Sequence, residues 1–257
     1  MAFMPDYRSA GIPGATAQAG AIDAGLRAYM LRIYNWMASG VLLTGLVAYG
    51  VAHTGLRALF YHVVPNAYGN MQLHPTLLGY ASIFAPLAFV LVLSFGVNRL
   101  SRGSAQALFW AFCAVMGASL TNIFFIYTDI SIVQTFFITA ATFAAMSLYG
   151  YTTRADLSRF GSFLMMGLIG IIIAGLVNMF LHSPMVQFVV SAIGVLVFVG
   201  LTAFDTQRIK WNYTQNLAYA GGGDIVAKAA VYDSLSLYLN FINLFTLLLQ
   251  FTGSRRD

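Results

Sequence analysis

Charged side chains are scarce in this sequence, and one of the four charged residue types is missing. Only 8% of the 257 residues are charged, against about 25% in an average soluble protein. So few charges cannot cover a soluble domain of this size, which excludes an ordinary cytosolic enzyme, a nucleic-acid-binding module and a disordered regulator. All 8 acidic residues are aspartate, and the lack of glutamate excludes metalloproteases of the HExxH type. The single cysteine, Cys113, excludes an internal disulfide.

Apolar residues, in contrast, make up 59% of the chain and gather in long runs without charge. A helix of about 20 apolar residues crosses the hydrocarbon core of a bilayer. The sequence therefore predicts an all-α integral membrane protein with seven transmembrane helices, at 29–51, 76–98, 105–127, 132–152, 162–182, 185–207 and 231–252. This divides the chain into a mobile cytoplasmic N-terminal tail (1–28), a seven-helix transmembrane domain (29–252) and a short C-terminal tail (253–257).

The basic residues predict the orientation, because cytoplasmic loops of membrane proteins carry an excess of Lys and Arg. With a cytoplasmic N-terminus and an outer C-terminus, the outer side holds only Arg57, Arg255 and Arg256. The cytoplasmic side then holds the rest: Arg8, Arg27, Arg32, Arg99, Arg102, Arg154, Arg159, Arg208, Lys210 and Lys228. The four histidines, His53, His62, His74 and His182, all fall on the outer side, too far apart in sequence for a recognisable metal motif.

Two connections and several small-residue stripes carry further predictions. The sequence predicts that Leu56 to Val64 is an amphipathic stretch lying on the outer surface. It predicts that 208–230 is the longest inner loop. Small residues let transmembrane helices approach closely. The expected packing seams are Ala140, Ala141, Ala144 and Ala145; Gly167, Gly170, Ala174 and Gly175; and Ser191, Ala192, Gly194 and Gly200.

Two aspartates at the inner ends of the last two spans are the candidate functional residues, because ionisable groups in a membrane are costly. Asp205 lies near the end of its helix, where the helix dipole disfavours an anion. It either pairs with Arg208 at i, i+3 or serves a function, with Arg208 reaching away to the surface. Asp233 is either an interfacial acid or part of a cation site at the inner mouth. An aspartyl protease needs both carboxylates at one depth, so we expect no enzyme here.

Three segments resemble the Bax inhibitor-1 family in its bacterial branch. They are Phe204 to Lys210 (FDTQRIK), Ser236 to Phe245 (SLYLNFINLF) and Ala140 to Leu157, which contains SLYGYTTRADL. The resemblance covers about residues 25–252. It implies a bundle in which the last helix is central, wrapped by the other six, and a pH-sensitive calcium leak. It also implies a gate and pH sensor formed by a hydrogen-bonded pair at Asp205 and position 240, with a latching arginine at Arg99 or Arg102.

Position 240 departs from the family pattern, which has aspartate there where this chain has Asn240. Two carboxylates in contact titrate as a coupled pair, whereas an Asp–Asn pair has one titrating group. We therefore expect the architecture to persist and the pH gating to be shifted or blunted. Asp205 and Asp233 would offer Ca²⁺ at most a weak site, suited to passage, since calcium prefers several oxygen ligands.

The leading functional hypothesis is thus a calcium or other cation leak channel of a bacterial inner membrane, with Ca²⁺ as the transported ion and no cofactor. The chief alternative is a non-conducting regulator that binds a membrane protease or another membrane partner through its inner loops. A proton-coupled transporter, in which Asp205 would face the two sides in turn, is the third hypothesis. No nucleic-acid partner is expected.

Overall fold

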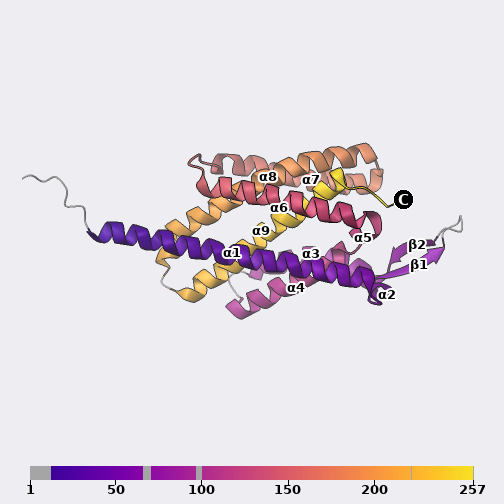
Figure 1. Ribbon diagram of the computed structural model, residues 1–257, viewed down its shortest axis with the longest axis horizontal. Helices are drawn as coiled ribbons and strands as arrows, with labels where there is room; N and C mark the ends of the chain where they lie inside the picture. The colour runs from indigo at the N-terminus through magenta and orange to yellow at the C-terminus, as the bar shows by residue number, and fades with distance from the viewer. Residues whose placement is uncertain (1–12, 66–70, 97–99, 221, 257) are drawn as a thin grey trace, which may run out of the picture.

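The computed structural model describes residues 13–65, 71–96, 100–220 and 222–256, and shows a helical bundle with one small β-hairpin (Figure 1). In chain order its elements are α1 (Pro13–His53), α2 (Arg57–Phe60), β1 (Tyr61–Pro65), β2 (Met71–Pro75), α3 (Leu77–Gly96), α4 (Arg102–Leu120), α5 (Ile123–Ile126), α6 (Asp129–Thr152), α7 (Ser158–Leu181), α8 (Pro184–Gln215), a 3-10 turn (Leu217–Tyr219) and α9 (Gly223–Thr252).

The all-α membrane class is confirmed, but the count of seven spans is not. Six helices among the described residues are long and apolar enough to cross a membrane: Gly20–His53, Arg102–Ile126, Asp129–Thr152, Ser158–Leu181, Pro184–Tyr219 and Gly223–Thr252. Each matches one predicted span. The remaining predicted span, 76–98, corresponds to α3, which has 20 residues and contains Pro86.

Side-chain caps explain where several of these helices begin. Ser101, Thr128 and Ser183 each accept a hydrogen bond from a backbone N–H in the first turn of α4, α6 and α8. Such a cap satisfies a donor that the helix itself leaves unpaired. Between α7 and α8 the chain turns at His182, whose φ of 50° ends α7 in the left-handed region, and Pro184 starts α8. The turn thus lies where the predicted spans 162–182 and 185–207 meet.

The last helix, α9, lies in the middle of the bundle, as the resemblance implies. It packs against α1, α4, α6 and α8, while α7 packs mainly on α8 and α3 mainly on α4. In Figure 1, α9 runs diagonally between α1 and the layer of α6, α7 and α8. Its close shell is therefore four helices, with α3 and α7 outside them.

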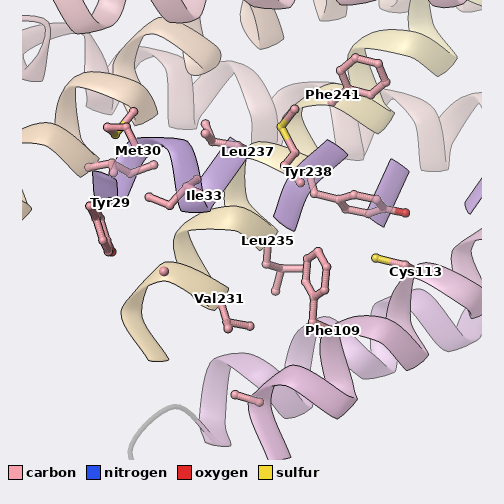
Figure 2. Packing of buried hydrophobic residues seen from close by; sticks show 14 of the residues in the cluster. Tyr29, Met30, Ile33, Phe109, Cys113, Val231, Leu235, Leu237, Tyr238 and Phe241 are labelled. Atoms are coloured by element: carbon pink, nitrogen blue, oxygen red, sulfur yellow. The ribbon is translucent and has the colours of Figure 1, made fainter. Parts of the chain in front are cut away.

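The central core lies where α9 meets α1 and α4. Phe109 and Cys113 of α4 face Leu235 and Tyr238 of α9 (Figure 2). The Tyr238 hydroxyl is 2.6 Å from the Thr44 hydroxyl of α1, which also donates to the Cys113 carbonyl oxygen at 2.9 Å. One polar contact inside an apolar core thus joins three helices.

Small residues do allow close helix contacts, but only some of the predicted stripes take part. Gly167 and Gly200 face side chains across the α7–α8 contact, and Gly194 faces Leu247 of α9. Gly170 and Gly175 face open space. Gly150, which belongs to none of the predicted stripes, lies so close to α8 that a Cβ atom there would be 2.2 Å from the backbone oxygen of Ala203.

Two predicted connections differ from the structure. The stretch Leu56 to Val64, predicted as amphipathic and lying on the outer surface, is a single helical turn followed by a β-strand that pairs with β2, and this strand was not predicted. The inner loop predicted over 208–230 is much shorter, because α8 continues to Gln215 and α9 begins at Gly223. Both helices extend past the apolar segments that defined the predicted spans.

Both predicted tails contain ordered structure. Helix α1 already begins at Pro13, and Gly25 packs against Tyr213 of α8, while residues 1–12 lie outside the described part of the chain. After α9, the backbone of Ser254 pairs with Thr128 and Ser131, and Arg256 forms an ion pair with Asp129 at 2.8 Å. The C-terminal segment is thereby tied to the start of α6.

Candidate functional site

Asp205 lies on α8 at its contact with α9, and only 6% of the residue is exposed. Tight packing of α8 against both α6 and α9 removes this part of the helix from solvent. A carboxylate at such a position needs hydrogen-bond donors or an opposite charge, because burying it alone would be very costly.

Three donors surround the Asp205 carboxylate. The Asn240 amide nitrogen of α9 lies 2.7 Å from Oδ2, and the Ser236 hydroxyl, one turn earlier on α9, donates to the same oxygen at 3.0 Å. The Arg208 guanidinium lies 3.0 Å from Oδ1. The structure therefore brings Asp205 and Asn240 together, as the resemblance implies.

Arg208 does not reach away from the site. It forms the i, i+3 ion pair with Asp205 and also donates to the Ser236 hydroxyl at 3.2 Å, while half of its side chain remains exposed. Asp205 thus has the local counter-charge of the first interpretation, and it also binds the neighbouring helix. Because the guanidinium is half exposed, water can solvate it if the carboxylate is occupied elsewhere.

The residues next to Asp205 connect α8 to other parts of the bundle. The Thr206 hydroxyl is 2.9 Å from the Ser147 hydroxyl of α6, which in turn bonds to the hydroxyl of Tyr34 on α1. Gln207 accepts from the Leu157 backbone and donates to the Ala155 carbonyl, both at 2.8 Å. Consecutive side chains of α8 therefore bind α9, α6 and the connection between α6 and α7.

Asp233 does not form part of the cluster around Asp205. It lies two helical turns before Asn240 on α9 and accepts a hydrogen bond of 2.6 Å from the Tyr29 hydroxyl of α1. It is half-buried and not simply interfacial. No sequence pattern pointed to Tyr29, which is distant in the chain and belongs to a residue type common at membrane surfaces.

Of the two arginines named as candidate latches, the one that the structure describes, Arg102, does not pair with Asp205. Arg102 stands in the first turn of α4 and forms an exposed ion pair of 3.4 Å with Asp224, near the start of α9. Arg99 lies outside the described residues. Among the residues that are described, the arginine bound to Asp205 is Arg208.

A second polar cluster joins α7, α8 and α9 toward the opposite end of α8. Gln187 donates to Gln250 of α9 at 2.6 Å and accepts from Asn178 of α7 at 3.2 Å. The Ser191 hydroxyl also donates to Gln250, at 3.1 Å. This outer cluster, defined as Asn178, Gln187, Ser191 and Gln250, contains no ionisable group.

A hollow of about 930 Å³ lies between α1 and α6, with Phe241 of α9 among its lining residues. Its walls are almost entirely apolar, and residues such as Leu42 and Leu148 in them are exposed on the outside of the bundle. Lipid chains suit such a surface better than ions do.

No ready-made metal centre is present in the described part of the chain, where no three His, Cys, Asp or Glu side chains gather around one point. The donors around Asp205 can instead hold its negatively charged carboxylate inside the bundle. The carboxylate can also exchange these donors for another binding partner. A divalent cation would have to compete with Arg208, Ser236 and Asn240 for the same two oxygens.

Comparison with known proteins agrees with the fold. Residues 26–257 match the family described as inhibitor of apoptosis-promoting Bax1. The inner membrane protein YbhL of Escherichia coli is 44% identical over 235 residues, covering 91% of this chain and 94% of YbhL. The uncharacterized protein RP147 of Rickettsia prowazekii is 43% identical over 235 residues, covering 91% of this chain and 93% of that protein. An uncharacterized protein of Caulobacter vibrioides is 43% identical over 239 residues, covering 92% of both chains.

Proposed function

The chain belongs to the Bax inhibitor-1 family, and on that premise we propose that it is a calcium leak channel of a bacterial inner membrane, gated at the Asp205–Asn240 contact. The activity is passive conduction without a chemical step. The observation that carries the proposal is the buried carboxylate of Asp205, shared between an arginine on its own helix and two donors on the central helix.

This arrangement suits a closed gate. While Asp205 binds Ser236 and Asn240, α8 and α9 are held together at this level of the membrane. Opening requires those two interhelical bonds to break, whereas the ion pair with Arg208 lies within α8 and can survive. The cost of opening is therefore set by two hydrogen bonds to a charged group, each worth about 1.5–3 kcal/mol.

Calcium is the proposed permeant ion because carboxylate oxygen is its preferred ligand. A cation arriving from the inner side would meet Asp233, which lies two helical turns before Asn240 on α9, and then Asp205. Two carboxylates are far fewer than the six to eight oxygens of a storage site, so the ion would be bound briefly and passed on. Asp205 and Asp233 thus form a transit route for the ion.

The pH response follows from having one carboxyl in the pair. Two aspartates in contact share a proton at low pH. At higher pH both carboxylates are charged and repel each other, because like charges in contact are unfavourable. The Asn240 amide donates to Asp205 at any pH, so the contact persists in both protonation states. We therefore expect a leak whose pH dependence is shallow or shifted.

The proposed topology has seven spans, a cytoplasmic N-terminus and an outer C-terminus. Helix α3 would be the seventh span, since 20 residues at 1.5 Å per residue give about 30 Å. The ends of the chain support this count, because α1 begins at one end of the bundle and the chain finishes at the other (Figure 1). The inner-membrane location rests on the likeness to YbhL.

One observation favours a second candidate, a non-conducting regulator that binds a membrane protease or another membrane protein. Helix α7 packs mainly on α8 and exposes large apolar side chains, among them Phe163 at 69% and Met166 at 71%. A helix of a partner could pack against this face. Under this hypothesis the purified protein would conduct nothing in clean liposomes and would co-purify with a defined membrane protein.

The test is calcium release from liposomes loaded with a calcium dye and containing the purified full-length chain. We expect release well above that of empty liposomes. We expect its loss in Asp205→Ala, because the ion then lacks the carboxylate ligand on its route, although the two closing bonds are also removed. Asp233→Ala, on the neighbouring helix, removes a transit carboxylate but leaves the gate contact intact, so it should reduce the release only partly. Release that is absent in the wild type would overturn the channel, and equal release in Asp205→Ala would remove the gate from α8.

A further inference from the structure

Two histidines that are far apart in sequence face each other in the β-hairpin. Strands β1 and β2 are antiparallel, and their register places His62 directly opposite His74. Side chains opposite each other in such a pair project to the same face of the hairpin. The rings are 6.3 Å apart between centroids and inclined by 30°, and both residues are exposed.

This spacing matches two imidazoles that share one metal ion. A metal–nitrogen bond of about 2.0–2.1 Å places two such rings roughly 4.5–6.4 Å apart between centroids, and the distance increases as the angle at the metal opens from about 90° to about 180°. The observed 6.3 Å lies at the wide end of that range. Small side-chain rotations, which exposed residues make freely, would then aim one nitrogen of each ring at a common point.

We infer that His62 and His74 form a surface site for a divalent transition metal, with water completing the coordination. Neutral imidazole is a ligand for Cu²⁺, Ni²⁺ and Zn²⁺, whereas Ca²⁺ and Mg²⁺ take oxygen ligands. The ion bound here is therefore chemically distinct from the ion proposed to pass the gate. Among these metals Cu²⁺ binds most tightly to a given nitrogen site.

The site is open and reversible. In the described residues no third His, Cys, Asp or Glu side chain joins the pair. Two protein ligands without a supporting shell of hydrogen bonds give an affinity well below that of a structural zinc centre. A bound ion would link β1 to β2 and so hold the two strands in register.

The hairpin lies at the same end of the molecule as the C-terminus and away from the start of α1 (Figure 1). It is therefore remote from Asp205, which lies on the half of α8 nearer the opposite end of the bundle. Metal binding at the hairpin is independent of the proposed gate, and either proposal can fail while the other holds.

The experiment is titration of the full-length protein in detergent with Cu²⁺, using a chain without a histidine tag because a tag would bind the ion itself. Isothermal titration calorimetry counts the ions bound, and electron paramagnetic resonance of the Cu²⁺ complex counts the coordinating nitrogens. We expect one ion per chain and two imidazole nitrogens. His62→Ala or His74→Ala should each weaken binding at least about tenfold, which is 1.4 kcal/mol.

The matched controls are His53→Ala and His182→Ala, exposed histidines elsewhere in the described structure, which should leave the affinity unchanged. His62→Asn and His74→Asn keep a polar side chain on the strand and guard against a folding defect. The double variant should bind no more weakly than either single one, because one remaining imidazole cannot chelate. Unchanged binding in the single variants, or no binding by the wild type, would overturn the site.

Discussion

Two side-chain hydrogen bonds join α8 to α9 at almost the same length, toward opposite ends of the helix pair. Toward the predicted inner side, Asn240 donates to Asp205 at 2.7 Å; toward the outer side, Gln187 donates to Gln250 at 2.6 Å. Both are amide-to-oxygen contacts supported by a serine hydroxyl. They differ in the acceptor group, which is a carboxylate at the inner end and an amide at the outer end.

Because of this difference, the outer cluster only holds the helices together, whereas the inner cluster can also respond to protons or cations. The outer cluster is neutral at every accessible pH and offers little to a metal cation. The inner cluster, made of Asp205, Arg208, Ser236 and Asn240, contains an anion, which a proton or a cation can engage. Although the two bonds are almost equal in length, the outer end of the α8–α9 pair is therefore expected to stay closed, and the inner end is expected to open and close.

The largest difference between the inner and outer clusters is expected when the Asp205 side chain is truncated. In Asp205→Ala the donors of Ser236 and Asn240 lose their acceptor, so we expect the free energy of unfolding to fall by about 1–3 kcal/mol. Thermal unfolding of the purified protein in detergent measures this. Ser191→Ala, which removes a donor from the outer cluster, is the control and should change stability much less. Equal losses in both variants would contradict the special role of the inner acceptor.

Restoring the family's carboxylate at position 240 should make calcium release strongly dependent on pH. In Asn240→Asp two carboxylates face each other, so a shared proton joins them at low pH and two negative charges separate them at high pH. We expect calcium release that rises steeply from about pH 5.5 to about pH 8, against a shallow profile in the wild type. A steep wild-type response that Asn240→Asp leaves unchanged would refute the blunted switch.

Removing the positive charge next to Asp205 should make its carboxylate more available to a cation. Arg208→Gln leaves the Asp205 carboxylate without its ion pair, so a divalent cation no longer competes with a guanidinium for Oδ1. We expect calcium release to increase several-fold, since partly exposed ion pairs contribute on the order of 1 kcal/mol. Arg159→Gln, an exposed basic residue on the same predicted side, is the control for general surface charge. A decrease in release would contradict competition at the carboxylate.

The smallest effect is expected at the outer cluster. Gln187→Leu removes the bonds to Asn178 and Gln250, and hydrogen bonds between membrane helices contribute about 0.6 kcal/mol on average. The melting temperature should fall slightly, and the pH profile of calcium release should keep its shape. A changed pH profile would show that the outer end also takes part in gating.

The helices were predictable because the bilayer imposes a length and an absence of charge on every span. The predicted spans end close to the observed ones at α6 and α7, where loops with Asp or Arg stand at the surface. The prediction was wrong at 208–230, because α8 and α9 continue as amphipathic helices beyond the apolar core. The strand within Leu56 to Val64 was not predicted, because pairing of β1 with β2 depends on a partner strand that periodicity does not reveal.

The site was predictable only in part. The resemblance placed Asp205 and Asn240 together, and their contact is observed. Ion pairing of Arg208 was one of two open alternatives, and its side-chain direction was settled only by the packing. The bonds of Tyr29 to Asp233 and of Tyr34 to Ser147 join residues 204 and 113 positions apart. Such contacts follow from how α1 crosses α6 and α9, which no local pattern encodes.

The central place of α9 has a consequence for how the protein is made. A ribosome delivers this helix last, after every helix that surrounds it has left the exit tunnel. Until then, Thr44 lacks Tyr238 and Asp205 lacks both of its donors on α9. Arg208, one turn away on the same helix, is the partner that Asp205 already has at that time. The ion pair can thus accompany α8 into the bilayer as a neutral unit, and arrival of α9 completes the bundle.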